Sequence, residues 1–272
     1  MYSHVIVGVD GRPGGKDAAA LAGTLAEPEA ARAIVYVSQF RPPADQPTHP
    51  ALELADAASL GGLLEEELAL SGGHAQMMRV SAPTVGAGLE GTAERHGAEL
   101  IVVGASRRHG LKRLGGRDDV HSVLEHTPIA VAVAPEGYRR RRRTLSLIGI
   151  AFDGSQQSIV ALAHGALLAE EHGCEMTIRR VVDPTGDRCA QLVVDGLDVE
   201  VVVGDVAGQL ADLSRRVDLL VCGSRRPGTL RRLALGSTGE YLARHAQSPL
   251  LIAPVSDDAS VQRWRALAKV TG

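Results

Sequence analysis

"ELIVVGASRRHGLKRLGGRDD", residues 99–119, returns later in the chain as "DLLVCGSRRPGTLRRLALGST", residues 218–238. The two stretches align without a gap, and Gly104 matches Gly223 at a step of 119 residues (223 − 104). The same step relates His126 to His245. Because self-similarity over this length is the mark of a repeated unit, we infer that the chain contains two copies of one domain.

The upstream halves of the two copies match at a different step. "VIVGVDG" at 5–11 matches "LIGIAFDGS" at 147–155, so Asp10 corresponds to Asp153 at a step of 143 (153 − 10). The second copy is therefore about 24 residues shorter (143 − 119) between these anchors. The first copy alone has residues 50–70, whose apolar spacing predicts an amphipathic helix.

Short apolar runs alternate with helix-like segments in each copy. Runs such as 100–104 and 219–222 are apolar at nearly every position, which is typical of parallel strands covered by helices on both faces. We therefore expect an α/β fold with two doubly wound parallel sheets in tandem. The last strands, near 129–134 and 250–253, carry no charge that would protect a sheet edge. We expect the sister domain or another chain to cover them, in an intrachain pseudo-dimer and a homodimer.

The repeat and the arginine run set the expected boundaries. We assign the first domain to 1–136, a linker to 137–145, the second domain to 146–256 and a C-terminal helix to 257–272. The run Arg139–Arg143 favours a solvated, self-repelling linker, and contact with nucleic acid or an acidic lipid surface is the alternative.

Composition excludes several classes of protein. The formal net charge of −3 and the 3% aromatic content argue against general nucleic-acid binding. No apolar run approaches a membrane span, and no secretory leader is evident, so we expect a cytoplasmic chain with no membrane partner. The spacing of the three cysteines indicates reduced thiols and no metal site.

Catalytic motifs are missing or misplaced. "GAGLEG" at 86–91 follows a third strand, not a first, so a dinucleotide site is not favoured. The chain has no P-loop and no G-x-S-x-G motif. We assign no catalytic residues, and the motifs do not indicate an efficient enzyme.

The glycine-framed loop 223–238 has the composition of a phosphate site. It follows a strand, and Gly236, Ser237 and Thr238 open the next predicted helix, whose free N–H groups favour an anion. Ser237 is a candidate N-cap. Arg225 and Arg226 add charge-assisted hydrogen bonds.

These motifs resemble the universal stress protein family in a tandem form. The resemblance rests on Asp153-Gly154-Ser155, on a G-x2-G-x9-G-[ST] loop and on the ending "SPLLIAP" at 248–254. It implies an adenine-nucleotide α-hydrolase-like fold with five parallel strands per domain in the order 3-2-1-4-5. It also implies a stress-response role and ATP, with Mg, as a candidate ligand that is not rapidly consumed. The candidate binding residues are Asp153, Gly223, Arg225, Arg226, Gly236, Ser237 and Thr238.

The two copies depart from the family pattern to different degrees. In the second copy Arg226 stands where the family has its middle glycine, so it either binds a phosphate or fills its place. In the first copy Arg107, Arg117 and Asp118 replace three of the four pattern residues. A carboxylate at 118 would repel phosphates by about 4 kcal/mol at 4 Å and an effective dielectric near 20, so we expect no ATP there.

Three hypotheses stay open at this point. The second domain binds an adenine nucleotide, the chain is a ligand-free dimerising scaffold that acts through protein partners, or it hydrolyses or transfers nucleotides. Asp10 and Asp153 also have a purely structural interpretation, since aspartate often closes such turns.

Overall fold

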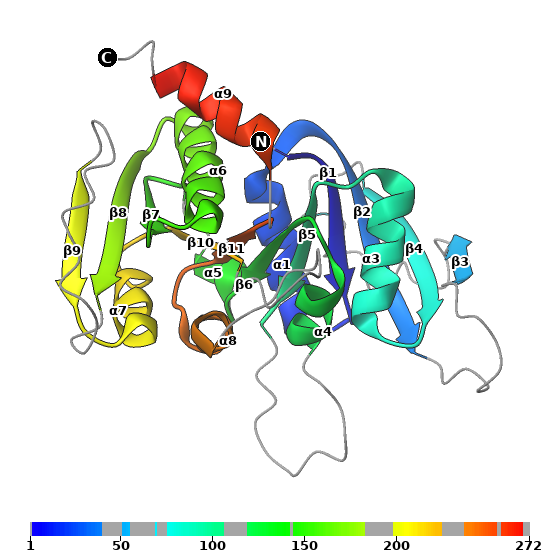
Figure 1. Cartoon of the computed structure of the whole chain (residues 1–272). Helices are drawn as coiled ribbons and strands as arrows, with labels where there is room; N and C mark the ends of the chain where they lie inside the picture. The colour runs from blue at the N-terminus through cyan, green and yellow to red at the C-terminus, as the bar shows by residue number, and fades with distance from the viewer. Residues whose placement is uncertain are drawn as a thin grey trace, which may run out of the picture. The chain divides into compact units, whose positions relative to one another are not determined.

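The computed structural model describes residues 2–39, 51–54, 69, 75–105, 119–141, 144–182, 198–224, 237–254 and 257–268. The chain forms two compact units, residues 1–142 and 143–272. Each is described by itself below (Figure 1).

The first unit alternates strands and helices along the chain. Its elements are β1 (Tyr2–Val9), α1 (Pro13–Leu25), β2 (Ala26–Gln39), β3 (Ala51–Leu54), β4 (Ala75–Ala82), α3 (Val85–His96), β5 (Leu100–Gly104), α4 (Asp119–His126), β6 (Ala130–Ala134) and α5 (Tyr138–Arg141). The strand order is β3-β4-β2-β1-β5-β6. All neighbours pair in parallel except β3, which lies antiparallel on the outer edge of β4.

The second unit repeats this plan without the added edge strand. Its elements are β7 (Leu147–Ala151), α6 (Gln156–His172), β8 (Glu175–Val182), β9 (Val199–Val203), α7 (Val206–Leu213), β10 (Leu219–Gly223), α8 (Ser237–His245), β11 (Leu250–Ala253) and α9 (Asp258–Ala268). The order β9-β8-β7-β10-β11 is parallel throughout.

Helices cover both faces of each sheet because consecutive strand residues point to opposite sides. In β1, a Cβ atom at Gly8 would meet Leu89 of α3, whereas the next residue, Val9, meets Gly15 of α1. The central strands are therefore buried on both faces, and Ile6 and Ile101 are almost completely excluded from water. This explains why β5 and β6 are apolar throughout.

The structure confirms the predicted fold, including the 3-2-1-4-5 order of the parallel strands in both units. One local prediction is wrong. Residues 51–54, at the start of the predicted helix 50–70, form strand β3, with Leu52 opposite Val80 and Glu53 opposite Arg79. The short-range helical pattern is overridden here by pairing with an open sheet edge, a tertiary interaction that periodicity does not report. Residues 55–68 lie outside the described part of the chain.

No helix in the described residues combines the length and the apolar character that crossing a bilayer requires.

A hydrogen bond between a carboxylate and an imidazole fixes the C-terminal helix in the second unit. Asp257 lies just before α9, and its Oδ1 accepts the Ser260 N–H at 3.0 Å, which caps the helix. Its Oδ2 lies 2.9 Å from Nε2 of His164, a residue of α6 that is only 8% exposed. The hydrogen bond with His164 holds the pKa of Asp257 well below its usual value. The packing of α9 on α6 is thus tied to a carboxylate that must stay ionised.

Asp257→Asn should weaken this attachment, most visibly through its pH dependence. A carboxylate whose pKa is lower in the folded state stabilises the fold above its unfolded pKa, near 4, and this contribution disappears as the pH falls further. The variant keeps an N-cap but lacks the carboxylate that hydrogen-bonds to His164, so we expect a loss of about 1 kcal/mol at pH 7, allowing for partial exposure. Thermal unfolding followed by circular dichroism at pH 7 and pH 3 measures this. The wild-type midpoint should fall further between the two pH values than that of the variant, and parallel shifts would contradict the assignment.

Candidate functional site

A pocket of about 280 Å³ lies in the first unit, at the carboxyl ends of its central strands. Its floor is formed where β1 and β5 end, at Asp10 and Gly104. One wall is apolar, and the first turn of α1 forms another. The pocket is lined by Gly8, Val9, Asp10, Arg12, Pro13, Gly14, Gly15, Asp17, Val35, Val37, Val85, Leu89, Val103, Gly104, Ala105 and Glu136. In a doubly wound sheet this is the edge where ligands bind.

The start of α1 presents its backbone to this pocket. Arg12 occupies the N-cap position without a side-chain cap bond, and Pro13 is the first helical residue. Gly14 and Gly15 follow, so no side chain covers the first turn from within the helix. An uncapped helix start with a partial positive charge suits an anionic or hydrogen-bond-accepting group.

The aspartates after the first strand of each copy close the turns in which they lie. Asp10 Oδ1 accepts the Arg12 N–H at 3.0 Å, and Asp153 Oδ1 accepts the Ser155 N–H at 2.9 Å. Gly11 and Gly154, which directly follow the two aspartates, have φ values of +72° and +84°, and residues with a side chain rarely adopt these values. The structural interpretation of both aspartates therefore has direct support. It leaves Asp10 in the lining of the pocket.

Gly104 and Gly223 serve a close approach between backbones. A Cβ atom at Gly104 would lie 2.2 Å from the carbonyl oxygen of Gly14, and one at Gly223 would lie 2.6 Å from that of Gln157. In each unit the end of the fourth parallel strand thus touches the backbone of the first helix. This contact brings the helix start to the strand ends.

The corresponding surface of the second unit carries larger side chains. At the step of 143, Gly14 corresponds to Gln157 and Gly8 to Ala151. Ser155 caps α6 by accepting the Ser158 N–H at 3.2 Å, so the protein's own side chain occupies this helix start. The replacements remove the features that open the pocket in the first unit.

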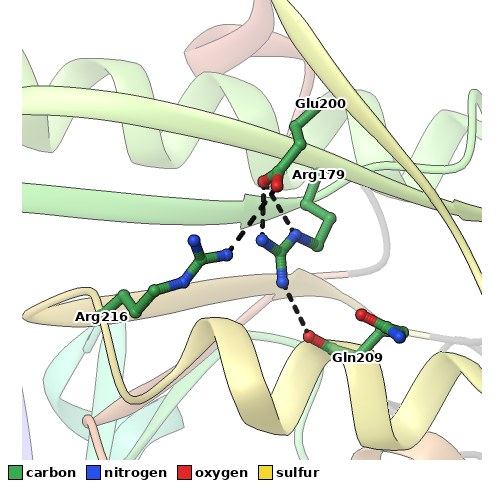
Figure 2. A network of polar contacts seen from close by, with 4 residues as sticks. All are labelled: Arg179, Glu200, Gln209 and Arg216. Atoms are coloured by element: carbon green, nitrogen blue, oxygen red, sulfur yellow. Dashed lines mark hydrogen bonds and ion pairs between the residues drawn. The ribbon is translucent and has the colours of Figure 1, made fainter.

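The largest replacement is Arg179, at the position that Val35 occupies in the first unit. Val35 pairs with Gly8, and Arg179 pairs with Ala151, which sets the correspondence. Figure 2 shows the Arg179 guanidinium between β9 and α7. Its Nε and Nη2 donate to Glu200 Oε2 at 3.0 and 2.6 Å, and Nη1 donates to the carbonyl oxygen of Gln209 at 3.0 Å. The side chain is 3% exposed, so a satisfied cation stands where the first unit has an apolar wall.

Cys222 lies at the end of β10, where the first unit has Val103. Burial raises the pKa of its thiol to about 12. The group therefore stays neutral at physiological pH and acts as a small apolar side chain, not as a nucleophile.

The predicted site residues of the second unit are placed only in part. Asp153 and Gly223 follow neighbouring strands, because β7 pairs with β10 through Ile150 and Val221. The structure brings their two strand ends to one edge. Ser237 and Thr238 are the first two residues of α8, so Ser237 begins the helix. Arg225, Arg226 and Gly236 lie outside the described residues, as do Arg107, Arg117 and Asp118 of the first copy.

Sequence reasoning missed the residues that open the pocket in the first unit. Gly14 and Gly15 stand in "DGRPGGKD" at 10–17, where the second copy has "DGSQQSIV" at 153–160. The smaller side chains of the first copy at these positions could have indicated an open helix start. No sequence signal marked the apolar wall or Glu136, because strand and loop residues of this kind occur throughout the chain.

Comparison with known proteins is consistent with this geometry. The family model described as the universal stress protein family matches residues 1–135 and 187–254. This is well over half of the chain. The protein belongs to the universal stress protein family.

Within this family, the universal stress protein Rv1996 of Mycobacterium tuberculosis is 29% identical over 130 residues. The match covers 46% of this chain and 36% of the relative, so the chain matches only about a third of that protein's length. A universal stress protein crystal structure from Archaeoglobus fulgidus aligns over 93% of this chain and 99% of its own, with 17% identity and a TM-score of 0.64. This likeness shows the shared fold.

A third family member was crystallised in complex with cAMP. It covers 49% of this chain and 96% of its own, with 23% identity and a TM-score of 0.36.

Glu200→Ala should destabilise the second unit because it leaves the buried Arg179 guanidinium with too few acceptors. We expect a loss of about 2 kcal/mol, reduced from the value for a fully buried pair because Glu200 is 44% exposed. Arg216→Ala is the matched control. It removes a 3.8 Å contact to the same carboxylate from an exposed side chain and should cost about 0.5 kcal/mol or less. Urea unfolding measures both, and equal effects would show that Arg179 does not depend on Glu200.

Proposed function

We propose that this universal stress protein binds an adenine nucleotide without efficient turnover, and that the nucleoside part lies in the pocket of the first unit. The observation that carries the proposal is that apolar side chains and an uncapped helix start line the same pocket. A purine needs an apolar slot, its ribose needs an acceptor, and a phosphate needs N–H donors.

The described contacts provide each of these. Val35, Val37 and Leu89 offer the slot, and all three face the α3 side of the sheet. Asp10 supplies carboxylate oxygens at the rim, where its side chain is 49% exposed. The start of α1 supplies its partial positive charge and the Gly14 N–H, since Pro13 has no N–H and the Gly15 N–H donates to the carbonyl oxygen of Arg12 at 3.0 Å. The pocket volume of about 280 Å³ lies at the small end of ligand sites, which favours a nucleoside or a monophosphate over a larger molecule.

The second unit keeps its own candidate site for phosphates. The sequence prediction for Asp153, Gly223, Arg225, Arg226, Gly236, Ser237 and Thr238 stays a prediction, with ATP and Mg as its ligand. Gln157 and Arg179 oppose a base slot there, because each replaces a small or apolar residue of the first unit. We therefore place the primary site in the first unit.

Gly14→Gln separates the two sites cleanly. A Cβ atom at Gly14 has its nearest neighbours at 3.7 and 3.8 Å, so the side chain fits without strain, as Gln157 shows in the other copy. We expect the variant to fold with an unchanged melting temperature and to lose binding at least tenfold. Isothermal titration calorimetry with AMP, cAMP and ATP-Mg measures this, with Ser237→Asp as the matched change in the second unit.

The two variants give distinct results. Loss with Gly14→Gln alone supports the first unit, and loss with Ser237→Asp alone moves the site to the second. The absence of heat with all three nucleotides at millimolar concentration would leave the ligand-free scaffold as the function. Phosphate release well above background would instead favour a hydrolase.

Asp118→Ser tests the electrostatic prediction for the first site. Residue 118 corresponds to Ser237 in the second copy, at the step of 119. If its carboxylate repels phosphates, wild-type protein should bind AMP more tightly than ATP, and the variant should gain at least tenfold in ATP affinity, measured by the same titration. Equal affinities for AMP and ATP in the wild type would show that the carboxylate does not face the ligand.

A further inference from the structure

The short helix α5 is attached to α1 by a buried carboxylate. Asp17 is 2% exposed. Its Oδ2 accepts the Gly137 N–H at 2.8 Å, and its Oδ1 accepts the Arg139 N–H at 2.9 Å. One side chain of α1 therefore caps the first turn of α5 with two charge-assisted hydrogen bonds.

A second attachment lies two turns further along α1. Tyr138 is 7% exposed, and its hydroxyl donates to Oγ1 of Thr24 at 3.1 Å. Gly137, with φ at +75°, allows the chain to turn into α5 between these two points. The attachment is thus defined by Asp17 at one end and by Thr24 at the other.

The same segment is part of the pocket wall. Asp17 and Glu136 both line the pocket, beside Gly14 and Gly15. The Arg141 guanidinium donates to the carbonyl oxygen of Glu136, which ties the far end of α5 to the same residue. A molecule in the pocket therefore meets α1 and the start of α5 together.

The docked helix α5 is densely charged. α5 carries Arg139, Arg140 and Arg141, and the run continues through Arg143. Like charges at this density repel one another, and the side chains of Arg140 and Arg141 are exposed. The helix has only four residues, so its attachment to α1 depends on the two Asp17 hydrogen bonds and on Tyr138.

We propose that occupancy of the first unit's pocket controls the docking of α5 on α1, and thereby how readily the backbone at Arg139, Arg140 and Arg141 is released from α1. The inference rests on the proposed function, since it assigns a regulatory consequence to the same site. A ligand that contacts both the first turn of α1 and Glu136 binds only the docked arrangement. The equilibrium constant for docking then rises by a factor of one plus the ratio of the ligand concentration to its dissociation constant.

Limited trypsin digestion of the full chain measures the opening of α5. Cleavage after Arg139, Arg140 or Arg141 requires the backbone of α5 to leave α1, and the products are identified by mass. With AMP or cAMP at 100 times its dissociation constant, cleavage at these positions should slow at least tenfold, against a limit of about a hundredfold. Cleavage after Arg263 and Arg265 in α9, both exposed, should not change and serves as the internal control.

Tyr138→Phe tests the attachment without altering the pocket lining. The ring keeps its buried place but loses the bond to Thr24, so cleavage of the run without ligand should rise about fivefold. Added nucleotide should still protect the variant by about the same factor as the wild type. Tyr241→Phe, on α8 in the second unit, is the control and should change neither rate.

The outcomes separate this inference from the proposed function. Saturable heat with unchanged cleavage of the run would overturn the inference and leave nucleotide binding intact. The absence of heat with every nucleotide would overturn both. Saturable heat together with slower cleavage after Arg139, Arg140 and Arg141, at an unchanged rate in α9, would support both.

Discussion

The close approach of Gly104 to Gly14 is the constraint on which the first unit depends. Only hydrogen fits between these two backbones, since a Cβ atom at Gly104 would lie 2.2 Å from a carbonyl oxygen. The contact sets the depth at which α1 begins relative to β5. It thereby opens a helix start and two strand ends onto one space. Gly223 and Gln157 repeat the contact in the second unit, so the duplication preserved the frame.

Side chains on this shared frame then separate the two copies. The first unit has glycine at the helix start and valine on the second strand, and these small side chains leave the pocket open. The second unit has Gln157, the serine cap of α6 and the buried Arg179 network, which satisfy the same surface internally. The two copies thus share one backbone frame but differ in the side chains that line the carboxyl ends of their strands.

The sequence was sufficient for the architecture because its signals were local and repeated. Apolar runs at 100–104 and 219–222, glycines at the strand ends and the constant step between copies all pointed to tandem doubly wound sheets. The strand β3 escaped prediction because pairing with β4, not local preference, determines its conformation. The pocket escaped for a related reason: it arises from small residues, and the distances between them exist only in three dimensions. Asp17 is a further case, since its partners Gly137 and Arg139 lie about 120 residues away.

The strand β3 also has a consequence for how the two sheets meet solvent. In the first unit it shields the outer edge of β4, whereas in the described residues β9 pairs with β8 alone. Val201 and Val203 of β9 are 54% and 64% exposed. Within the described part of the chain, the outer edge of β9 and its two exposed valines are therefore where pairing with a further strand is expected at high concentration. A fragment that contains only the second unit would keep this edge. Charged residues in place of Val201 and Val203 should reduce its self-association.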